Sequence, residues 1–146
     1  MTEGRIYQVQ QILDHEGWKF EKNNNDILLV AAFRTKKWKM VINCEVENRV
    51  CCFSVFPWVC PEDKLTGIWG ALNELNLAQR IGCFMINTAD ARVVYRCGIH
   101  ILDEYTSHDY IKEVLLSSVA LVNANWDKVY SVIYGAGRDF HTSKIV

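Results

Sequence analysis

The stretch from Pro57 to Arg96 constrains the fold more than any other part of the sequence. It has the pattern of a strand end, a helix begun by proline, a glycine stop and a β-hairpin. Pro61 suits the first helical turn, since its φ is fixed and it has no N–H to leave unbonded. Arg80 and then Gly82 follow where the carbonyl groups of a helix C-terminus favour a cation and a flexible residue. Between Pro61 and Arg80, apolar residues recur at helical spacing and predict an amphipathic helix: Leu65, Ile68, Trp69, Leu72 and Leu75.

Two more helices are predicted outside this stretch. Helical spacing of apolar residues begins near Thr2 and is stopped by Gly17. A longer pattern starts at Thr106 or Ser107, which are suitable N-caps, and ends at Gly135. Its apolar stripe consists of Val114, Leu115, Leu121, Val122, Trp126, Val129 and Ile133.

Alternating and continuous apolar runs predict the strands. Residues 18–21 start or lead into a strand, and two of the later runs, 27–33 and 50–56, lack a polar face. These two are expected to be covered on both sides. The complete set is 27–33, 38–45, 50–56, 83–87 and 92–101. The order α-β-β-β-α-β-β-α predicts an α+β fold with a single antiparallel sheet of about five strands and three helices.

Length and composition fit one domain over residues 1–146, because half of the residues are apolar and suffice for a core. Residues 136–146 show no pattern and are expected to form an irregular C-terminal tail. The 16 basic and 17 acidic residues give a net charge of −1, which provides no overall attraction to nucleic acid or an anionic membrane. We find no signal-peptide pattern and no apolar run near the roughly 18 residues of a membrane span. The expectation is a cytoplasmic protein that binds neither nucleic acid nor membrane.

The basic stretch from Arg34 to Lys39 is a local exception to this charge balance. Trp38 lies inside it and offers a ring for stacking on nucleic acid bases. A solvated hairpin turn is the simpler interpretation, since the charges are few. The sequence favours the turn.

Six cysteines admit three interpretations, namely buried structural thiols, a metal site or a redox-active pair. No C-x-x-C pair is present, and the lack of a secretion signal argues against a disulfide framework. If Glu47 and Asn48 form a two-residue turn, Cys44 and Cys51 face each other across a hairpin. The sequence favours structural thiols and predicts no metal site, with Cys44 and Cys51 as the one pair to examine.

Residues that can carry out chemistry are sparse. Two groups could form acid–base pairs, namely His100 with Asp103 and Glu104, and His108 with Asp109. No nucleophile or oxyanion-binding pattern accompanies them, and no glycine-rich loop leads into a helix. The sequence therefore predicts neither an enzyme nor a cofactor.

Two sets of residues are candidates for binding. Asn73 and Asn76 lie near the apolar face of the predicted central helix, where each can bind a ligand or merely bond the neighbouring backbone. The second set can anchor a partner surface, as aromatic residues often do, or pack in the core: Trp58, Leu65, Trp69 and Leu72.

Several segments resemble the YbjN family. In the constraining stretch they are Phe56-Pro57-Trp58-Val59-Cys60-Pro61, Asn73-Glu74-Leu75-Asn76, Gly82-Cys83-Phe84-Met85-Ile86 and Arg92-Val93-Val94-Tyr95-Arg96. Earlier, Gly17-Trp18-Lys19-Phe20-Glu21 and the strands after it are similar too. The resemblance extends to about Gly135, and it departs at Asp90-Ala91, where the family commonly has Asp-Gly.

This resemblance implies a fold like that of type III secretion chaperones, often dimeric, in bacteria or their relatives. The family is described as proposed sensory transduction regulators, and no catalytic residue carries over from it. We therefore expect a non-enzymatic, chaperone-like interaction or regulatory module that forms a homodimer and binds a protein or peptide segment. The alternative is a small-ligand or metal-binding module that uses Cys44, Cys51 or Asn76.

Overall fold

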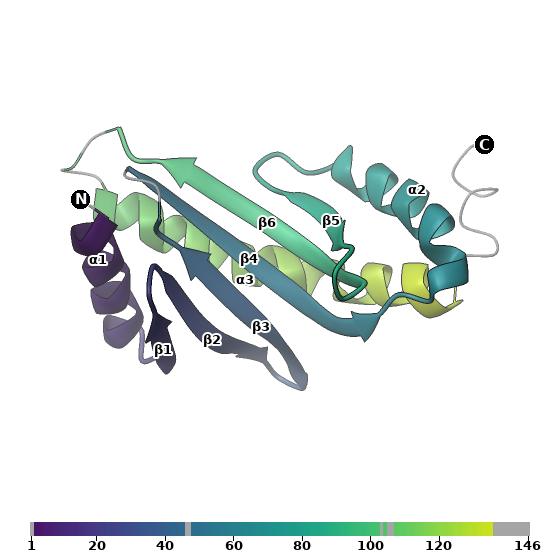
Figure 1. Ribbon diagram of the computed structural model, residues 1–146, viewed down its shortest axis with the longest axis horizontal. Coiled ribbons are helices and arrows are strands. Elements are labelled where there is room, and N and C mark those ends of the chain that lie inside the picture. Colours follow the sequence, from purple (N-terminus) through teal and green to yellow (C-terminus); the bar gives the residue numbers. More distant parts are fainter. Residues whose placement is uncertain (1, 46–47, 103, 105–106, 136–146) are drawn as a thin grey trace.

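The computed structural model describes residues 2–45, 48–102, 104 and 107–135. The predicted tail at 136–146 and three residues named above, Glu47, Asp103 and Thr106, lie outside this part. Figure 1 shows the elements, which are α1 (Thr2–His15), β1 (Phe20–Asn23), β2 (Asp26–Phe33), β3 (Lys36–Asn43), β4 (Arg49–Val59), a 3-10 turn (Glu62–Lys64), α2 (Leu65–Asn76), β5 (Cys83–Asn87), β6 (Arg92–His100), α3 (Ser107–Tyr130) and a π turn (Ser131–Gly135). The predicted α+β class is confirmed.

The strands form one antiparallel sheet in the order β1-β2-β3-β4-β6-β5. It has six strands where the sequence predicts about five. The additional strand is β1, which forms a hairpin with β2 in which Asn23 pairs with Asp26. Asn24 in this turn has a φ of 55°, a left-handed value that asparagine tolerates better than most residues.

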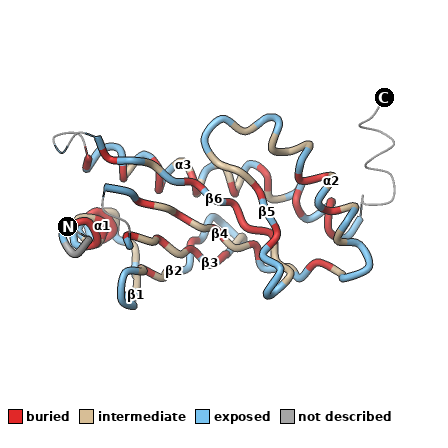
Figure 2. Tube along the Cα trace, turned by 45° about the horizontal axis from the view of Figure 1, so that its top comes forward, coloured by how far each residue is buried: buried red, intermediate tan, exposed pale blue. Residues whose placement is uncertain are grey.

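Helix α3 lies behind the sheet and packs on β4 and β6 (Figure 1). Helix α1 packs on α3 and β2, and α2 packs on β5 and the π turn, so all three helices lie on one side. Buried residues alternate along the strands (Figure 2). The predicted stripe of α3 is confirmed, with five buried residues and two partly buried ones: Val114, Leu115, Val122, Val129 and Ile133, then Leu121 and Trp126.

An aromatic cluster joins α3 to the middle of the sheet. The ring of Trp126 lies 4.7 Å from that of Trp58, 5.7 Å from Trp38 and 5.8 Å from Phe56, measured between centroids. Such pairs stabilise a fold by about 0.5–1.5 kcal/mol each beyond the burial of their surface. The cluster fixes the position of α3 along β3 and β4.

The opposite face of the sheet has no helix over it in the described part of the chain (Figure 1). The expected cover on both sides of 27–33 and 50–56 is therefore wrong. On this face Val30 is 68% exposed, while Phe53 and Val55 are only partly buried by their neighbours on the sheet. Because these two runs are apolar almost throughout, polar and apolar residues do not alternate along them. The sequence alone therefore did not show which face of the sheet is open. We call this surface the open face.

Helix α2 ends at Asn76, earlier than the predicted last turn at Arg80. Gly82 also has a different role from the predicted helix stop. A Cβ atom at Gly82 would lie 2.5 Å from the carbonyl oxygen of Arg96 and 2.7 Å from the ring of Tyr95. Glycine is present because the backbone of β6 passes too close for a side chain, while its φ is not in the left-handed region.

Replacing Gly82 with alanine should destabilise the protein by about 1–3 kcal/mol, because the added Cβ collides with a backbone oxygen of β6. The free energy of unfolding in urea measures the effect. Gly4→Ala in α1 is the matched control, since nothing lies within 4 Å of its Cβ position. Alanine is better than glycine by about 0.5–1 kcal/mol in a helix. Equal unfolding midpoints for the two variants would contradict the close approach.

Candidate functional site

The edge of β2 is only half covered by its neighbour. β1 pairs with β2 from Asn23–Asp26 to Phe20–Leu29, whereas β2 continues to Phe33. The chain enters the sheet only at Phe20, because α1 continues to His15 and is followed by a turn at Gly17, whose φ is 78°. Residues 30–33 of β2 therefore pair with β3 on one side and have no strand on the other among the described residues.

Backbone groups of β2 face this open edge. Phe33 and Lys36 close the two-residue turn between β2 and β3, and residues that close such a turn exchange both backbone hydrogen bonds. Alternate residues direct their N–H and C=O to opposite sides of a strand. Val30 and Ala32 therefore present these groups to the edge, where another extended chain can bond to them.

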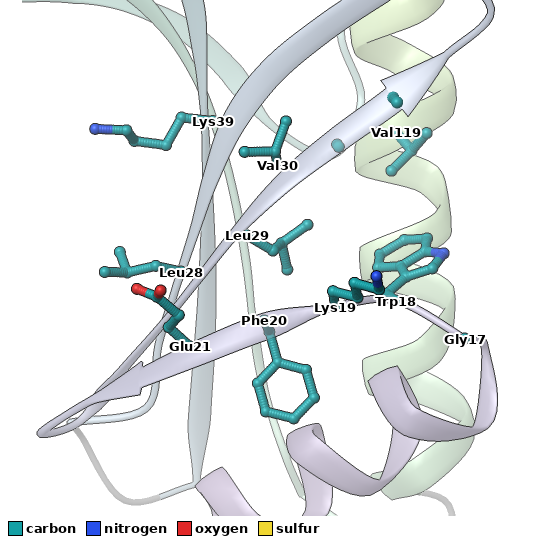
Figure 3. Close-up of a pocket in the computed structure, with 12 residues that line it drawn as sticks. Gly17, Trp18, Lys19, Phe20, Glu21, Leu28, Leu29, Val30, Lys39 and Val119 are labelled. Carbon is teal, nitrogen blue, oxygen red and sulfur yellow. The ribbon is translucent and has the colours of Figure 1, made fainter.

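A cleft of about 980 Å³ surrounds the same edge. In Figure 3, Val30 and Lys39 lie on one side of β2, and Leu29, Trp18 and Val119 lie on the other side, toward α3. Its lining is mainly apolar and comprises Gly17, Trp18, Lys19, Phe20, Glu21, Leu28, Leu29, Val30, Ala31, Ala32, Lys39 and Val119. The cleft thus combines unpaired backbone with apolar surface on both faces of one strand.

The structure separates the four predicted interface residues. Leu72 is 2% exposed and Leu65 packs on the core from a partly buried position. Trp58 belongs to the aromatic cluster and also contacts Tyr130, with ring centroids 5.1 Å apart. Trp69 is 48% exposed on α2. Of this set, Trp69 presents the most apolar surface to a partner.

Asn76, one of the two predicted ligand residues, bonds to backbone instead. Its Nδ2 donates to the carbonyl oxygen of Phe84 at 3.0 Å, and its Oδ1 accepts from the N–H of Phe84 at 2.6 Å. Both polar functions of the amide therefore hold the end of α2 against β5. Asn73, the other predicted ligand residue, is exposed on the same helix.

The predicted pairing of Cys44 with Cys51 is wrong. Cys51 pairs with Asn43, one residue away from the expected register. A shift of one residue moves a side chain to the other face of a sheet. Cys44 is fully buried on the helix side, and Cys51 is half-buried on the open face. The loop between β3 and β4 is longer than the assumed two-residue turn, and Asn48 in it has a φ of 62°.

Burial makes several cysteine thiols hard to ionise. It raises the pKa of Cys44 to about 11 and that of Cys52 to about 12. Thiols must lose their protons to bind metals or attack disulfides, so neither group suits such a role. Among the described residues, no three His, Cys, Asp or Glu side chains gather closely enough to hold a metal ion.

Two other candidates from the sequence, the stacking ring of Trp38 and the acid–base candidate Glu104, do not line the cleft. Trp38 is 2% exposed, so its ring is inside the core and does not offer a stacking surface. Glu104 accepts two hydrogen bonds from the guanidinium of Arg5, at 2.8 and 3.0 Å. Sequence patterns did not indicate the cleft itself, although Gly17 and the asparagines at 23–25 mark the short length of β1.

Comparisons with known proteins show the fold. No family model matches this sequence. No curated protein sequence matches it either. Among solved structures, the chain is similar to one of a proposed bacterial transcription regulator, with a TM-score of 0.57 and 14% identity over 83% of this chain and 93% of the other. That structure is the crystal structure of YbjN from E. coli. The fold is therefore YbjN-like, as the sequence resemblance implied. None of the described helices is long and apolar enough to cross a membrane.

Asn76→Ala should reduce the free energy of unfolding by about 2–3 kcal/mol, because it leaves two backbone groups of Phe84 without partners. Denaturant titration followed by tryptophan fluorescence measures this change. The exposed Asn73→Ala on the same helix should stay within about 0.5 kcal/mol of the unsubstituted protein. A similar small effect at both positions would show that the Asn76 amide does not hold α2 to β5.

Proposed function

We propose that this protein is a non-enzymatic interaction module that binds an extended segment of another protein along the open edge of β2. The observation that carries the proposal is the coincidence of unpaired strand backbone with the apolar cleft of about 980 Å³. Backbone hydrogen bonds to Val30 and Ala32 would supply affinity, and the cleft would receive alternate side chains of the bound segment.

The chemistry of the lining supports binding over catalysis. The cleft is lined by no serine, threonine, cysteine or histidine from the described residues, and its titratable side chains are Lys19, Glu21 and Lys39. These groups lack the nucleophile and base partnership that acyl or phosphoryl transfer needs. An apolar surface with a few charges at its rim is typical of a peptide-binding groove.

The similarity to YbjN is consistent with a regulatory role, since that protein is described as a proposed transcription regulator. At 14% identity the similarity supports the fold, while the specific role proposed for this chain rests on its own cleft. Capture of a partner's exposed segment is a direct way for a small protein without catalytic groups to change that partner's activity.

Val30→Gln should weaken binding of an extended peptide by about tenfold, because the valine side chain contributes about 1.5 kcal/mol when a partner covers it. Peptides are first selected from a displayed library of random dodecamers against the unsubstituted protein. The dissociation constant of one fluorescein-labelled selected peptide is then measured by fluorescence polarisation. Val30 is already 68% exposed, so the substitution should leave the fold intact.

Leu102→Gln is the matched control, since Leu102 is 92% exposed and does not line the cleft. It should bind the peptide as the unsubstituted protein does. Ala32→Pro removes a backbone N–H that faces the open edge and should also weaken binding, because proline cannot donate to an added strand. Equal binding by all three variants would contradict a site on this edge.

We also propose that the protein forms a homodimer through the exposed part of α2. Trp69 is a large apolar side chain, 48% exposed, on a helix whose other side is buried. Trp69→Glu should convert a dimer to a monomer in sedimentation equilibrium, because a charge in an apolar interface is costly to desolvate. Tyr110→Glu, at a tyrosine 50% exposed on α3, is the control. A monomeric mass for the unsubstituted protein at all concentrations would contradict the dimer.

A further inference from the structure

A second, smaller depression of about 270 Å³ lies on the open face. Its apolar lining includes Val30, Val55 and Pro57. Pro57 has no N–H to donate to the sheet, and the pairing of β4 with β6 shifts register between Val55 and Val59. A bulge bends a strand locally, so the irregularity at Pro57 accounts for a hollow in an otherwise continuous sheet.

Three cations surround this hollow, namely Lys37, Lys39 and Arg92. No aspartate or glutamate lines it, and none of the three forms an ion pair with the described residues. The Asp90 carboxylate accepts from the backbone N–H of Arg92 at 3.3 Å, while the side-chain Nε of Arg92 is buried without a partner in the described part of the chain. In a chain of net charge −1, this is a local positive site with unused donors.

The hollow and the β2 cleft adjoin each other. Val30 and Lys39 line both, and they are direct partners in the pairing of β2 with β3. Lys39 is in turn opposite Val55 on β4. A segment on the edge of β2 is two strand spacings, about 10 Å, from β3. Three extended residues span that distance.

We propose that the hollow receives an aspartate or glutamate of the same segment that binds the β2 edge, so that this protein selects apolar segments carrying an acidic residue. This inference rests on the function proposed above. A carboxylate fits because its oxygens accept charge-assisted hydrogen bonds from lysine and, in a fork geometry, from arginine. The apolar floor of Val30, Val55 and Pro57 suits the aliphatic part of such a side chain. Two aromatic residues, Trp38 and Phe56, also line the hollow, but they are 2% and 0% exposed. Their rings therefore give no platform for stacking bases, which favours a peptide over single-stranded nucleic acid.

The test uses the same displayed library of random dodecamers, selected against the full chain and against two variants. Lys37→Glu reverses a charge that lines the hollow but not the cleft. Lys128→Glu, on an exposed position of α3 behind the sheet, is the control of equal charge change. Peptides selected by the unsubstituted protein and by Lys128→Glu should be enriched in aspartate and glutamate, and those selected by Lys37→Glu should not.

A selected peptide and its version with the acidic residue changed to glutamine are then compared by fluorescence polarisation. Loss of the carboxylate should weaken binding about five- to tenfold in the unsubstituted protein and much less in Lys37→Glu. Raising the salt concentration should reduce the difference.

The two proposals fail in different ways. If no peptide is enriched, the peptide-binding function and this inference both fall. If peptides are enriched without acidic residues, or the Lys37→Glu and Lys128→Glu variants behave alike, the inference falls and the edge site stands. If a single-stranded DNA 20-mer binds as tightly as the selected peptides and with the same loss in Lys37→Glu, the hollow serves nucleic acid and the inference is overturned.

Discussion

The packing of α3 on the inner face of β4 and β6 is the contact on which the rest of this structure depends. A single helix of 24 residues spans the sheet, and its buried stripe meets the inner face through Trp126 and the aliphatic residues around it. Because the apolar surface is buried on this side only, the core is one layer deep between sheet and helices. The other face of the sheet has no helix over it in the described part of the chain, and the hollow lined by Lys37, Lys39 and Arg92 lies on that face.

Periodicity predicted the helices and strands well because each is a local property of the chain. The stripe of α3, the β5–β6 hairpin and the stop at Gly17 all follow from side-chain spacing and turn residues within a few positions of each other. The predicted single sheet follows from the same local patterns, whereas the YbjN-like fold was implied by the resemblance of several segments to that family.

Register and burial were harder to predict because they depend on contacts between distant segments. A difference of one residue in the β3–β4 loop places Cys51 on the face opposite Cys44, and no residue pattern in the loop specified its length. The apolar run 27–33 predicted a strand covered on both faces. A strand with one exposed apolar face can have the same composition as a strand buried on both faces, so composition did not distinguish the two. The cleft was missed because it arises where β1 stops, which no single residue type marks.

Polar groups in this protein divide into those that hold elements together and those left available. The Asn76 amide and the Arg5 guanidinium are engaged in joining separate parts of the chain. Lys37, Lys39 and Arg92 form no ion pair with the described residues and lie together on the open face. Of these named groups, the two on helices bond to other elements, and the three cations at the hollow stay without an ion-pair partner among the described residues.

The late entry of the chain into the sheet, at Phe20, affects how this fold can vary among related proteins. The number of β2 residues left unpaired equals the difference in length between β2 and β1, and it is set by the short connection from α1 to β1. Insertions or deletions in such a connection are well tolerated. In a relative with a longer β1, the whole edge of β2 would be paired. In a relative with a shorter β1, more of that edge would be open to a bound segment, and the core would be unchanged in both cases.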